Sequence, residues 1–289
     1  MKIEQPASAE GRAAFVHSAT STLIWKRVAR VIAVANQKGG VGKTTTTVNL
    51  AASLAAAEQR TLVVDGDPQG NATSGLGVTS ALEGTLYDVL IGAVDVRRVL
   101  RSKVHFDRLD LVPATPDLAG AEVELIDREP RGLAMREALE PIRNDYDFIL
   151  IDCPPSLGLI TLNMLAAADS VLIPLQCEYY ALEGLSQLLN TVHRLQHGVN
   201  EKLEIAGVLL TMYDARLNLS RQVASDAREY FGQTVFETVV PRNIRLAEAP
   251  SFGKPIILYD VGSVGAKAYM SVARELIART TSTEMSHGS

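Results

Sequence analysis

Short apolar runs alternate along most of the chain with longer segments of helical length. The runs are nearly continuous and rich in β-branched residues, as expected for strands buried on both faces of a sheet. They cover residues 31–35, 61–64, 148–151, 170–173 and 205–210. Segments with the length and composition of helices cover residues 43–57, 132–144, 181–196, 220–231 and 264–279. This alternation predicts an α/β fold with a largely parallel, twisted sheet and helices on both faces.

The two ends of the chain lack this pattern. Residues 1–29 show no sustained periodicity and are predicted to form a flexible extension, with a short helical stretch at residues 23–27. Residues 30–279 are expected to form a single domain, because no repeat or low-complexity linker divides them. Residues 280–289 are polar and are expected to fray.

Composition narrows the class of protein. With 47% hydrophobic and 21% charged residues among 289, the chain is typical of globular proteins rather than disordered or fibrous ones. No apolar run approaches the roughly 18 residues of a membrane span, and the N-terminus has no apolar core of a secretory signal. A cytoplasmic location is therefore predicted. Cys153 and Cys177 are too few for a disulfide framework and are expected to be reduced core residues.

A glycine-rich turn follows the first predicted strand and leads into the first predicted helix. Residues 36–45 read NQKGGVGKTT. Glycines let backbone N–H groups turn toward an anion, and the N-terminus of a helix favours negative charge. The turn therefore predicts a phosphate-binding site, with Lys43 at the β- and γ-phosphates and the Thr44 hydroxyl on Mg²⁺. A tight turn with two exposed lysines would explain neither the glycines nor the strand before them.

Lys38 departs from the usual phosphate-binding motif, G-x-x-x-x-G-K-[ST], which would place a glycine at Gln37. Two lysines five residues apart do not easily reach one phosphate tail from the same side, so Lys38 is free to bind elsewhere. Residues 38–44 fit K-G-G-x-G-K-[ST], and here the chain resembles the deviant Walker A ATPases. The resemblance implies that Lys38 reaches the ATP of a second copy in an ATP-dependent sandwich homodimer. A solvated lysine is the simpler alternative.

The phosphate-binding residues implied by this resemblance form one continuous segment. They are Lys38, Gly39, Gly40, Val41, Gly42, Lys43, Thr44 and Thr45. The two lysines of the segment are also the expected catalytic cations.

Acidic residues follow two of the apolar runs. Because parallel strands present their carboxyl ends to the ligand, Asp65, Asp67 and Asp152 are expected beside the phosphates. Asp152 ends an apolar strand, as a Walker B acid does, and is predicted to hold Mg²⁺; capping the next helix is the alternative. By resemblance, Asp67 orients the attacking water and Asp65 lies nearer the metal. Family members usually carry a bulky apolar residue where this chain has Gly66.

Further segments resemble the chromosomal ParA/Soj partition ATPases over residues 30–279. They read DPQGNAT (67–73), DCPPS (152–156), EYYALEG (178–184), TMYD (211–214) and PRNIRLAEAPS (241–251). The resemblance implies that Pro241 and Asn243 lie by the adenine, that Met212 is nearby, and that residues 179–184 lie near the dimer face. It also implies nucleoid association and hydrolysis stimulated by a ParB/Spo0J-like centromere-binding protein.

Charge is unevenly distributed. The net charge is −5, yet residues 61–160 carry 17 acidic against 9 basic residues, and residues 239–279 carry 3 against 6. A polyanion should therefore meet the C-terminal part. No segment has the pattern of a base-reading helix, so nonspecific, salt-dependent binding to double-stranded DNA is predicted. The candidate cations, each of which could instead be solvated or internally paired, are Arg216, Arg221, Arg242, Arg245, Lys254 and Lys267.

Three other functions are possible on the same fold. A MinD-like membrane-associated regulator would need an amphipathic C-terminal anchor, whereas Val264, Ala268, Val272 and Leu276 form a stripe that favours core packing. An iron–sulfur reductase component like the nitrogenase iron protein is disfavoured because Cys153 adjoins the expected metal acid. A small-molecule ligase or kinase would transfer phosphate to a metabolite rather than to water.

Overall fold

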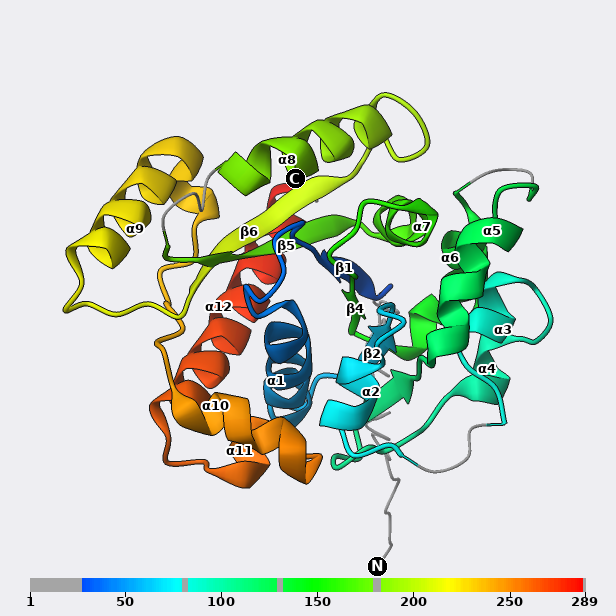
Figure 1. Ribbon diagram of the computed structural model, residues 1–289, viewed down its shortest axis with the longest axis horizontal. Helices are drawn as coiled ribbons and strands as arrows, with labels where there is room; N and C mark the ends of the chain where they lie inside the picture. The colour runs from blue at the N-terminus through cyan, green and yellow to red at the C-terminus, as the bar shows by residue number, and fades with distance from the viewer. Residues whose placement is uncertain (1–27, 80–82, 129–131, 179–182, 288–289) are drawn as a thin grey trace, which may run out of the picture.

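Six parallel strands form the central layer of the protein, between two layers of helices (Figure 1). The computed structural model describes residues 28–79, 83–128, 132–178 and 183–287. The strand order is β3-β2-β4-β1-β5-β6. The strands are β1 (Arg30–Val34), β2 (Thr61–Asp65), β3 (Leu109–Val112), β4 (Phe148–Asp152), β5 (Ser170–Gln176) and β6 (Glu204–Thr211). The predicted single α/β domain with a parallel sheet is confirmed.

Strand β3 is the strand that the sequence pattern did not predict. It is only four residues long, lies at the sheet edge, and contains Asp110 in the middle of its apolar positions. Asp110 is used locally, because its carboxylate accepts hydrogen bonds from the Tyr146 hydroxyl and the Lys103 N–H. A short edge strand with an internal acid has no continuous apolar run to reveal it.

Alternate residues along each strand serve two different cores. In β1, Ile32 and Val34 belong to one apolar cluster, and Val31 and Ala33 belong to the other. The first cluster packs under α1 (Lys43–Ala56), α2 (Asn71–Gly75), α10 (Ile244–Glu248), α11 (Ile256–Tyr259) and α12 (Val264–His287). The second packs under α3 (Leu86–Leu90), α4 (Val96–Val99), α5 (Ala121–Glu124), α6 (Ala134–Leu139), α7 (Leu159–Ala167), α8 (Glu183–Gln196) and α9 (Asn218–Phe231). Of these helices, α2, α3, α4, α5, α7, α10 and α11 were not among the predicted segments.

Two helical segments differ from their prediction. Residues 132–144 form α6 followed by the 3-10 helix η2 (Glu140–Asp145), because Pro141 has no N–H to continue an α-helix. Helix α12 continues to His287, beyond the predicted helix end at residue 279. No Gly or Pro interrupts that stretch, and the hydroxyls of Thr280 and Thr281 donate to the Ile277 carbonyl.

The predicted apolar stripe of the last helix is only partly buried. Ala268, Val272 and Leu276 are buried in the core under α1, but Val264 is 55% exposed because it begins the helix. Within the described residues, no helix has the length and apolar character needed to cross a bilayer. The expected extension over residues 1–29, with its helical stretch at residues 23–27, lies almost entirely outside the described residues.

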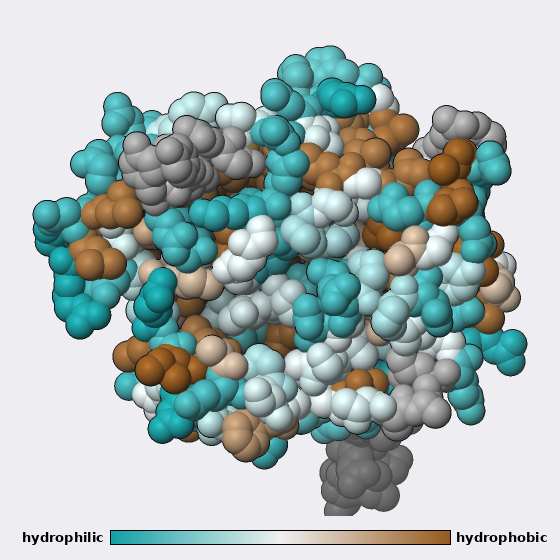
Figure 2. All heavy atoms as spheres, in the orientation of Figure 1, coloured by the Kyte–Doolittle hydropathy of each residue, from teal (hydrophilic) through white to brown (hydrophobic). Residues whose placement is uncertain are grey.

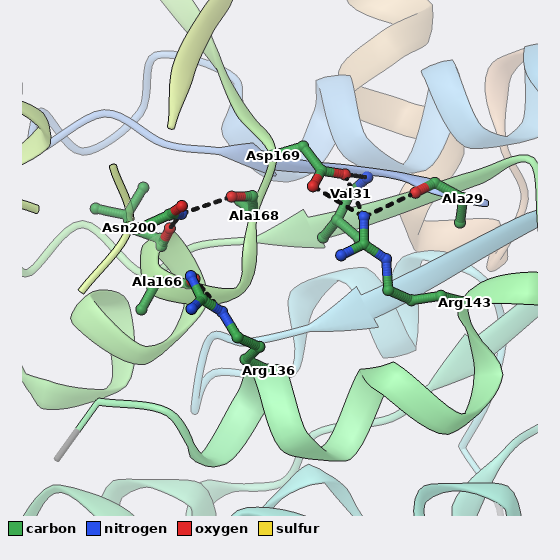
Figure 3. A network of polar contacts seen from close by, with 9 residues as sticks. Ala29, Val31, Arg136, Arg143, Ala166, Ala168, Asp169 and Asn200 are labelled. Carbon is green, nitrogen blue, oxygen red and sulfur yellow. Dashed lines mark hydrogen bonds and ion pairs between the residues drawn. The ribbon is translucent and has the colours of Figure 1, made fainter. Parts of the chain in front are cut away.

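A polar network fixes the N-terminal ends of β1 and β5 (Figure 3). The Asp169 carboxylate accepts the Val31 N–H at 2.8 Å and forms an ion pair with Arg143 at 2.7 Å. The same guanidinium donates to the Ala29 carbonyl at 3.1 Å. The Val31 N–H is fully buried, so this carboxylate satisfies a donor that water does not reach. The network therefore fixes β1 at the end of the strand opposite the glycine-rich turn.

The C-terminal end of α7 is held by the same group of side chains. Its last carbonyls have no partner within the helix. Arg136 of α6 donates to the Ala166 carbonyl, and Asn200 donates to the carbonyls of Leu165 and Ala168 at 3.0 and 2.7 Å (Figure 3). Helix α7 is thus anchored at the end that is farther from the Asp152 strand terminus.

Asp169→Ala tests the importance of this network for stability. The substitution leaves the Val31 N–H and the Arg143 guanidinium without their acceptor, and we expect it to lower the free energy of unfolding by about 1–3 kcal/mol. Asp107→Ala is the control, because Asp107 pairs with Lys103 on the exposed surface, where a pair contributes about 0–1 kcal/mol. Urea unfolding measures both variants. Equal losses would contradict the importance of the network.

Candidate functional site

The glycine-rich turn lies between β1 and α1, as predicted, and its backbone is held from both sides. Gly40 and Gly42 have φ angles of 76° and 90°, in the left-handed region that favours glycine. The Asn36 side chain anchors the turn by donating to the Pro174 carbonyl at 2.8 Å and accepting the Lys38 N–H at 3.0 Å. No side chain caps the N-terminus of α1. Its first N–H groups are therefore free to bind an anion.

Lys43 lies in the first turn of α1 and is almost fully buried. Its ammonium donates to the Lys38 carbonyl at 3.2 Å. Burial lowers the pKa of Lys43, while the nearby Asp152, Cys153 and Asp67 oppose that shift. The side chain thus folds back over the turn, where it brings positive charge to the place where phosphates would bind.

The carboxylates of Asp65 and Asp152 end neighbouring strands. The two residues are direct partners in the β2–β4 register, and both are fully buried. Burial raises the pKa of Asp65 to about 6. Burial also raises the pKa of Asp152, and the negative charge of Asp65 adds to this effect. Two carboxylates this close favour a shared proton or a bound cation.

The hydrogen bonds distinguish the two acids. Asp65 Oδ2 accepts from both the N–H and the hydroxyl of Thr73, at 2.7 and 2.6 Å, which ties β2 to α2. Asp152 Oδ1 accepts from the Thr47 hydroxyl at 3.2 Å. Asp152 Oδ2 is buried without a hydrogen-bond partner among the described residues. The oxygen available to a metal is therefore on Asp152 rather than on Asp65, which had been expected nearer the metal.

The residues around Asp152 fit a Mg²⁺ ion bound together with phosphate. Nowhere in the described part of the chain do three or more His, Cys, Asp or Glu side chains group as a metal cage. Mg²⁺ characteristically uses one or two carboxylates, waters and phosphate oxygens instead. Thr44, at the start of α1, and the free oxygen of Asp152 supply such a partial set. The cysteines need not take part: both are buried and reduced, as expected.

Asp67 lies just beyond β2. Its carboxylate accepts the Gln69 N–H at 2.9 Å, and its own N–H donates to Asp65 at 3.3 Å. Its side chain is less deeply buried than those of the two strand-end acids. This placement at the edge of the site is compatible with contact to a water molecule.

A cavity of about 330 Å³ adjoins the glycine-rich turn. It brings together Met212, Pro241 and Asn243, the residues predicted to lie by the adenine, with Gly42 and Thr45 at its edge. Met212 adopts a left-handed backbone with φ 51°. The Asn243 oxygen accepts the Arg245 N–H at 2.8 Å, so the amide nitrogen of Asn243 remains as a donor. The walls are mostly apolar, as in sites for an aromatic base.

Sequence reasoning missed three polar residues that shape this site. Asn36 anchors the turn, Thr73 binds Asp65, and Thr47 binds Asp152. Tyr269 of α12 also lines the cavity and hydrogen-bonds the Thr46 hydroxyl at 3.1 Å. Thr73 stands in a motif that carried the resemblance and Asn36 begins the glycine-rich turn, but nothing in the sequence alone shows which atoms they contact.

The ammonium groups of Lys38 and Lys43 contact different residues. Its ammonium forms a 3.5 Å ion pair with Glu178, and both side chains are partly exposed. Only the Lys38 carbonyl faces Lys43. The two lysines therefore point to different places, as predicted. Most of the segment 179–184, expected near a dimer face, lies outside the described residues.

The six candidate DNA-binding cations are not equally available. Arg216 pairs with Asp214 at 2.6 Å, and Arg245 pairs with Glu248 at 2.9 Å. Arg242 is 3.9 Å from Glu178, and Arg221 donates to the Ala215 carbonyl at 3.3 Å. Arg216 and Arg242 line one hollow of about 440 Å³. Lys254 and Lys267 are exposed and form no ion pair with a described residue.

The buried carboxyl pair should make the stability of the metal-free chain depend on pH. Asp65 and Asp152 both have folded pKa values raised above the unfolded value, which is about 4. The folded state then holds more protons than the unfolded state from about pH 4 to about pH 6 or higher, so the free energy of unfolding falls as pH rises through that window.

Urea unfolding in a chelator tests this prediction. Each carboxyl contributes a slope of at most about 1.4 kcal/mol per pH unit. Asp152→Asn should flatten the profile, whereas Asp107→Asn at the exposed pair should retain it. A wild-type profile without a falling limb would contradict the raised pKa values.

Comparisons with known proteins agree with this geometry. The family model described as an AAA domain matches residues 29–205. The chain is 57% identical over 258 residues to the chromosome partitioning protein ParA of Myxococcus xanthus, which covers 89% of this chain and 91% of that protein. It is 56% identical to the sporulation initiation inhibitor protein Soj of Bacillus subtilis, over 86% of this chain and 98% of that one.

Solved structures share the fold of this chain. Cobyrinic acid a,c-diamide synthase from Mycobacterium smegmatis, with bound ADP and magnesium, is 39% identical with a TM-score of 0.77, covering 88% of this chain and 96% of that one. The cell division ATPase MinD of Pyrococcus furiosus is 28% identical with a TM-score of 0.72, covering 86% and 98%. The sequence relatives, the fold and the glycine-rich turn beside buried acids together place this chain in the ParA/Soj family of P-loop ATPases.

Proposed function

We propose that this ATPase is a DNA-partitioning switch, in which ATP closes a homodimer, the dimer binds DNA, and hydrolysis releases it. The observation that carries the proposal is the position of Lys38. Its ammonium stands beside the nucleotide site and away from Lys43, paired with a half-exposed Glu178. A cation in this position can reach a triphosphate presented by a second copy. The names of the relatives, chromosome partitioning protein and Soj, support the biological setting.

The chemistry assigned to the chain is hydrolysis of the γ-phosphate. Mg²⁺, when bound, supplies charge neutralisation between the phosphates. Thr44 and Asp152 would hold that ion, and Lys43 with the N–H groups of residues 39–45 would stabilise the charge that develops on the phosphoryl oxygens. Asp67 would orient the attacking water. Carboxylates are weak general bases, so we infer slow basal turnover.

Acceleration by a partner follows from the same arrangement. A site that binds nucleotide but lacks a strong general base hydrolyses ATP slowly. A partner protein can raise the rate of hydrolysis most by contributing a cation or by positioning the attacking water. We assign this part to a ParB/Spo0J-like centromere-binding protein, because the relatives of this chain are named as partition proteins.

DNA binding is assigned to the surface around α10 and the start of α12. Figure 2 shows an apolar patch over α10 with hydrophilic residues around it. Exposed apolar residues of this region include Ile244 and Phe252, and the exposed Lys254 and Lys267 form no ion pair with a residue that the structure describes. Lysine side chains bind the phosphates of the DNA backbone without reading the base sequence. The proposed location in the cell is accordingly the nucleoid.

Two alternatives on this fold are less well supported. A metabolite ligase is favoured by the 39% identity to cobyrinic acid a,c-diamide synthase, but the ParA relative is 57% identical over a similar share of the chain. Phosphate release from ATP without any added metabolite would favour the switch. A MinD-like membrane role is disfavoured because α12 packs Ala268, Val272 and Leu276 of its apolar stripe into the core.

Lys38→Ala tests the switch directly. Without the ammonium, the triphosphate of one copy has no partner from the other, so we expect loss of ATP-dependent dimers in light scattering while each copy still binds ATP. Lys103→Ala is the control, because the ion pair of Lys103 among the described residues is with the exposed Asp107. Dimers of the Lys38 variant at saturating ATP would remove the trans contact from the proposal.

Lys254→Ala tests the DNA surface. If Lys254 contacts a phosphate, its removal lowers the slope of log K against log salt by about 0.9, for all DNA sequences alike. The salt dependence of DNA retention with ATP, with ADP and without nucleotide measures this slope. Lys103→Ala should leave it unchanged. An unaltered slope for Lys254→Ala would place the DNA elsewhere.

A further inference from the structure

Gly66 separates the two acids Asp65 and Asp67, and the structure leaves no room for a side chain there. A β-carbon built on Gly66 would lie 2.0 Å from Met164 Cε, 2.4 Å from Met164 Sδ and 2.7 Å from the Asp152 carbonyl oxygen. The φ angle of Gly66 is not in the left-handed region, so the backbone itself would accept another residue. Space, not backbone conformation, requires glycine at this position.

The space is filled by Met164, a fully buried side chain of α7. Its thioether end lies against the backbone that joins Asp65 to Asp67. The Gly66 N–H also donates to the Asp152 carbonyl at 2.9 Å, so the β2 and β4 strand ends approach closely there. Met164 thus packs against the point where the backbones of all three acids meet.

The Asp67 carboxylate accepts fewer hydrogen bonds than the Asp65 carboxylate. Asp65 is fixed by two hydrogen bonds from Thr73. Asp67 is held by the Gln69 N–H alone among the contacts of its carboxylate with described residues. The N–H groups of Gly66 and Asp67 are hydrogen-bonded to Asp152 and Asp65, and Met164 adds packing at a glycine, the residue with the widest conformational freedom.

We propose that Met164 is a positioning residue for ATP hydrolysis: it packs on Gly66 and thereby holds Asp67 where the attacking water binds. The proposal rests on the water-orienting role of Asp67 given under the proposed function. Helix α7 is anchored at its C-terminal end by Arg136 and Asn200, so it offers a firm base for this contact. Met164 takes over the constraint that a side chain at position 66 would otherwise supply.

A double-mutant cycle tests the contact. Met164→Ala removes the support, and we expect kcat for ATP hydrolysis to fall about five- to tenfold with KM for ATP within about twofold, since a small misplacement affects the reaction more than binding. Gly66→Ala should also lower kcat, because its β-carbon meets Met164. The double variant should turn over at least about threefold faster than Gly66→Ala alone, since Met164→Ala clears the two closest contacts.

Met135→Ala is the matched control for loss of a buried methionine. Met135 is equally buried in the same core, on α6. We expect a similar drop in melting temperature for both single methionine variants but an unchanged kcat for Met135→Ala. Equal effects on kcat, or no recovery in the double variant, would overturn the positioning role.

The Asp67→Ala background separates this proposal from the one on which it rests. With Asp67 absent, Met164→Ala should lower kcat no further. If Asp67→Ala keeps full turnover, the water-orienting role fails and the positioning role fails with it, whereas the Gly66–Met164 packing is still judged by recovery in the double variant. A further loss of kcat in the Asp67→Ala background would show that Met164 acts by another route.

Discussion

Two carboxylates buried side by side at the ends of β2 and β4 are the constraint on which the rest of the site depends. Asp65 and Asp152 are paired in register and have no solvent exposure. Buried like charges repel and raise each other's pKa, so such a pair persists only with compensation. In the described residues the compensation comes from the hydroxyls of Thr73, Thr44 and Thr47 and from the nearby ammonium of Lys43.

This compensation leaves two kinds of polar group without a partner, and both lie where a nucleotide would bind. One oxygen of Asp152 has no partner among the described residues, and the first N–H groups of α1 have no side-chain cap. A magnesium-bound triphosphate would satisfy both deficits at once, because it brings a cation to the acid and an anion to the helix. Binding of nucleotide and order at the strand ends are therefore coupled by electrostatics rather than by a separate device.

The elements around the site contact one another in a continuous series. Thr73 ties Asp65 to α2, and Asn49 of α1 accepts the N–H of Ile256 at the start of α11. Gly253 approaches Gly77 so closely that a β-carbon on either residue would meet the backbone of the other. The loop after α2 and the segment that carries Lys254 are thus in direct contact. A change at the phosphates has a short path to the surface proposed to bind DNA.

The sequence by itself determined the fold class, the glycine-rich turn and the acids that end the strands. These features depend on local patterns: continuous apolar runs, glycines where φ is positive, and polar residues where a strand stops. The pattern missed β3, whose four residues contain Asp110, and it did not show how far α12 continues.

Only the tertiary structure decided which atoms meet. It distinguished Asp152, with a free oxygen, from Asp65, engaged by Thr73. It placed Met164 against Gly66 across nearly one hundred residues of chain. Local pattern sets which residues stand at the end of a strand, but contacts between distant segments depend on how whole elements pack, and no short stretch of sequence encodes that packing.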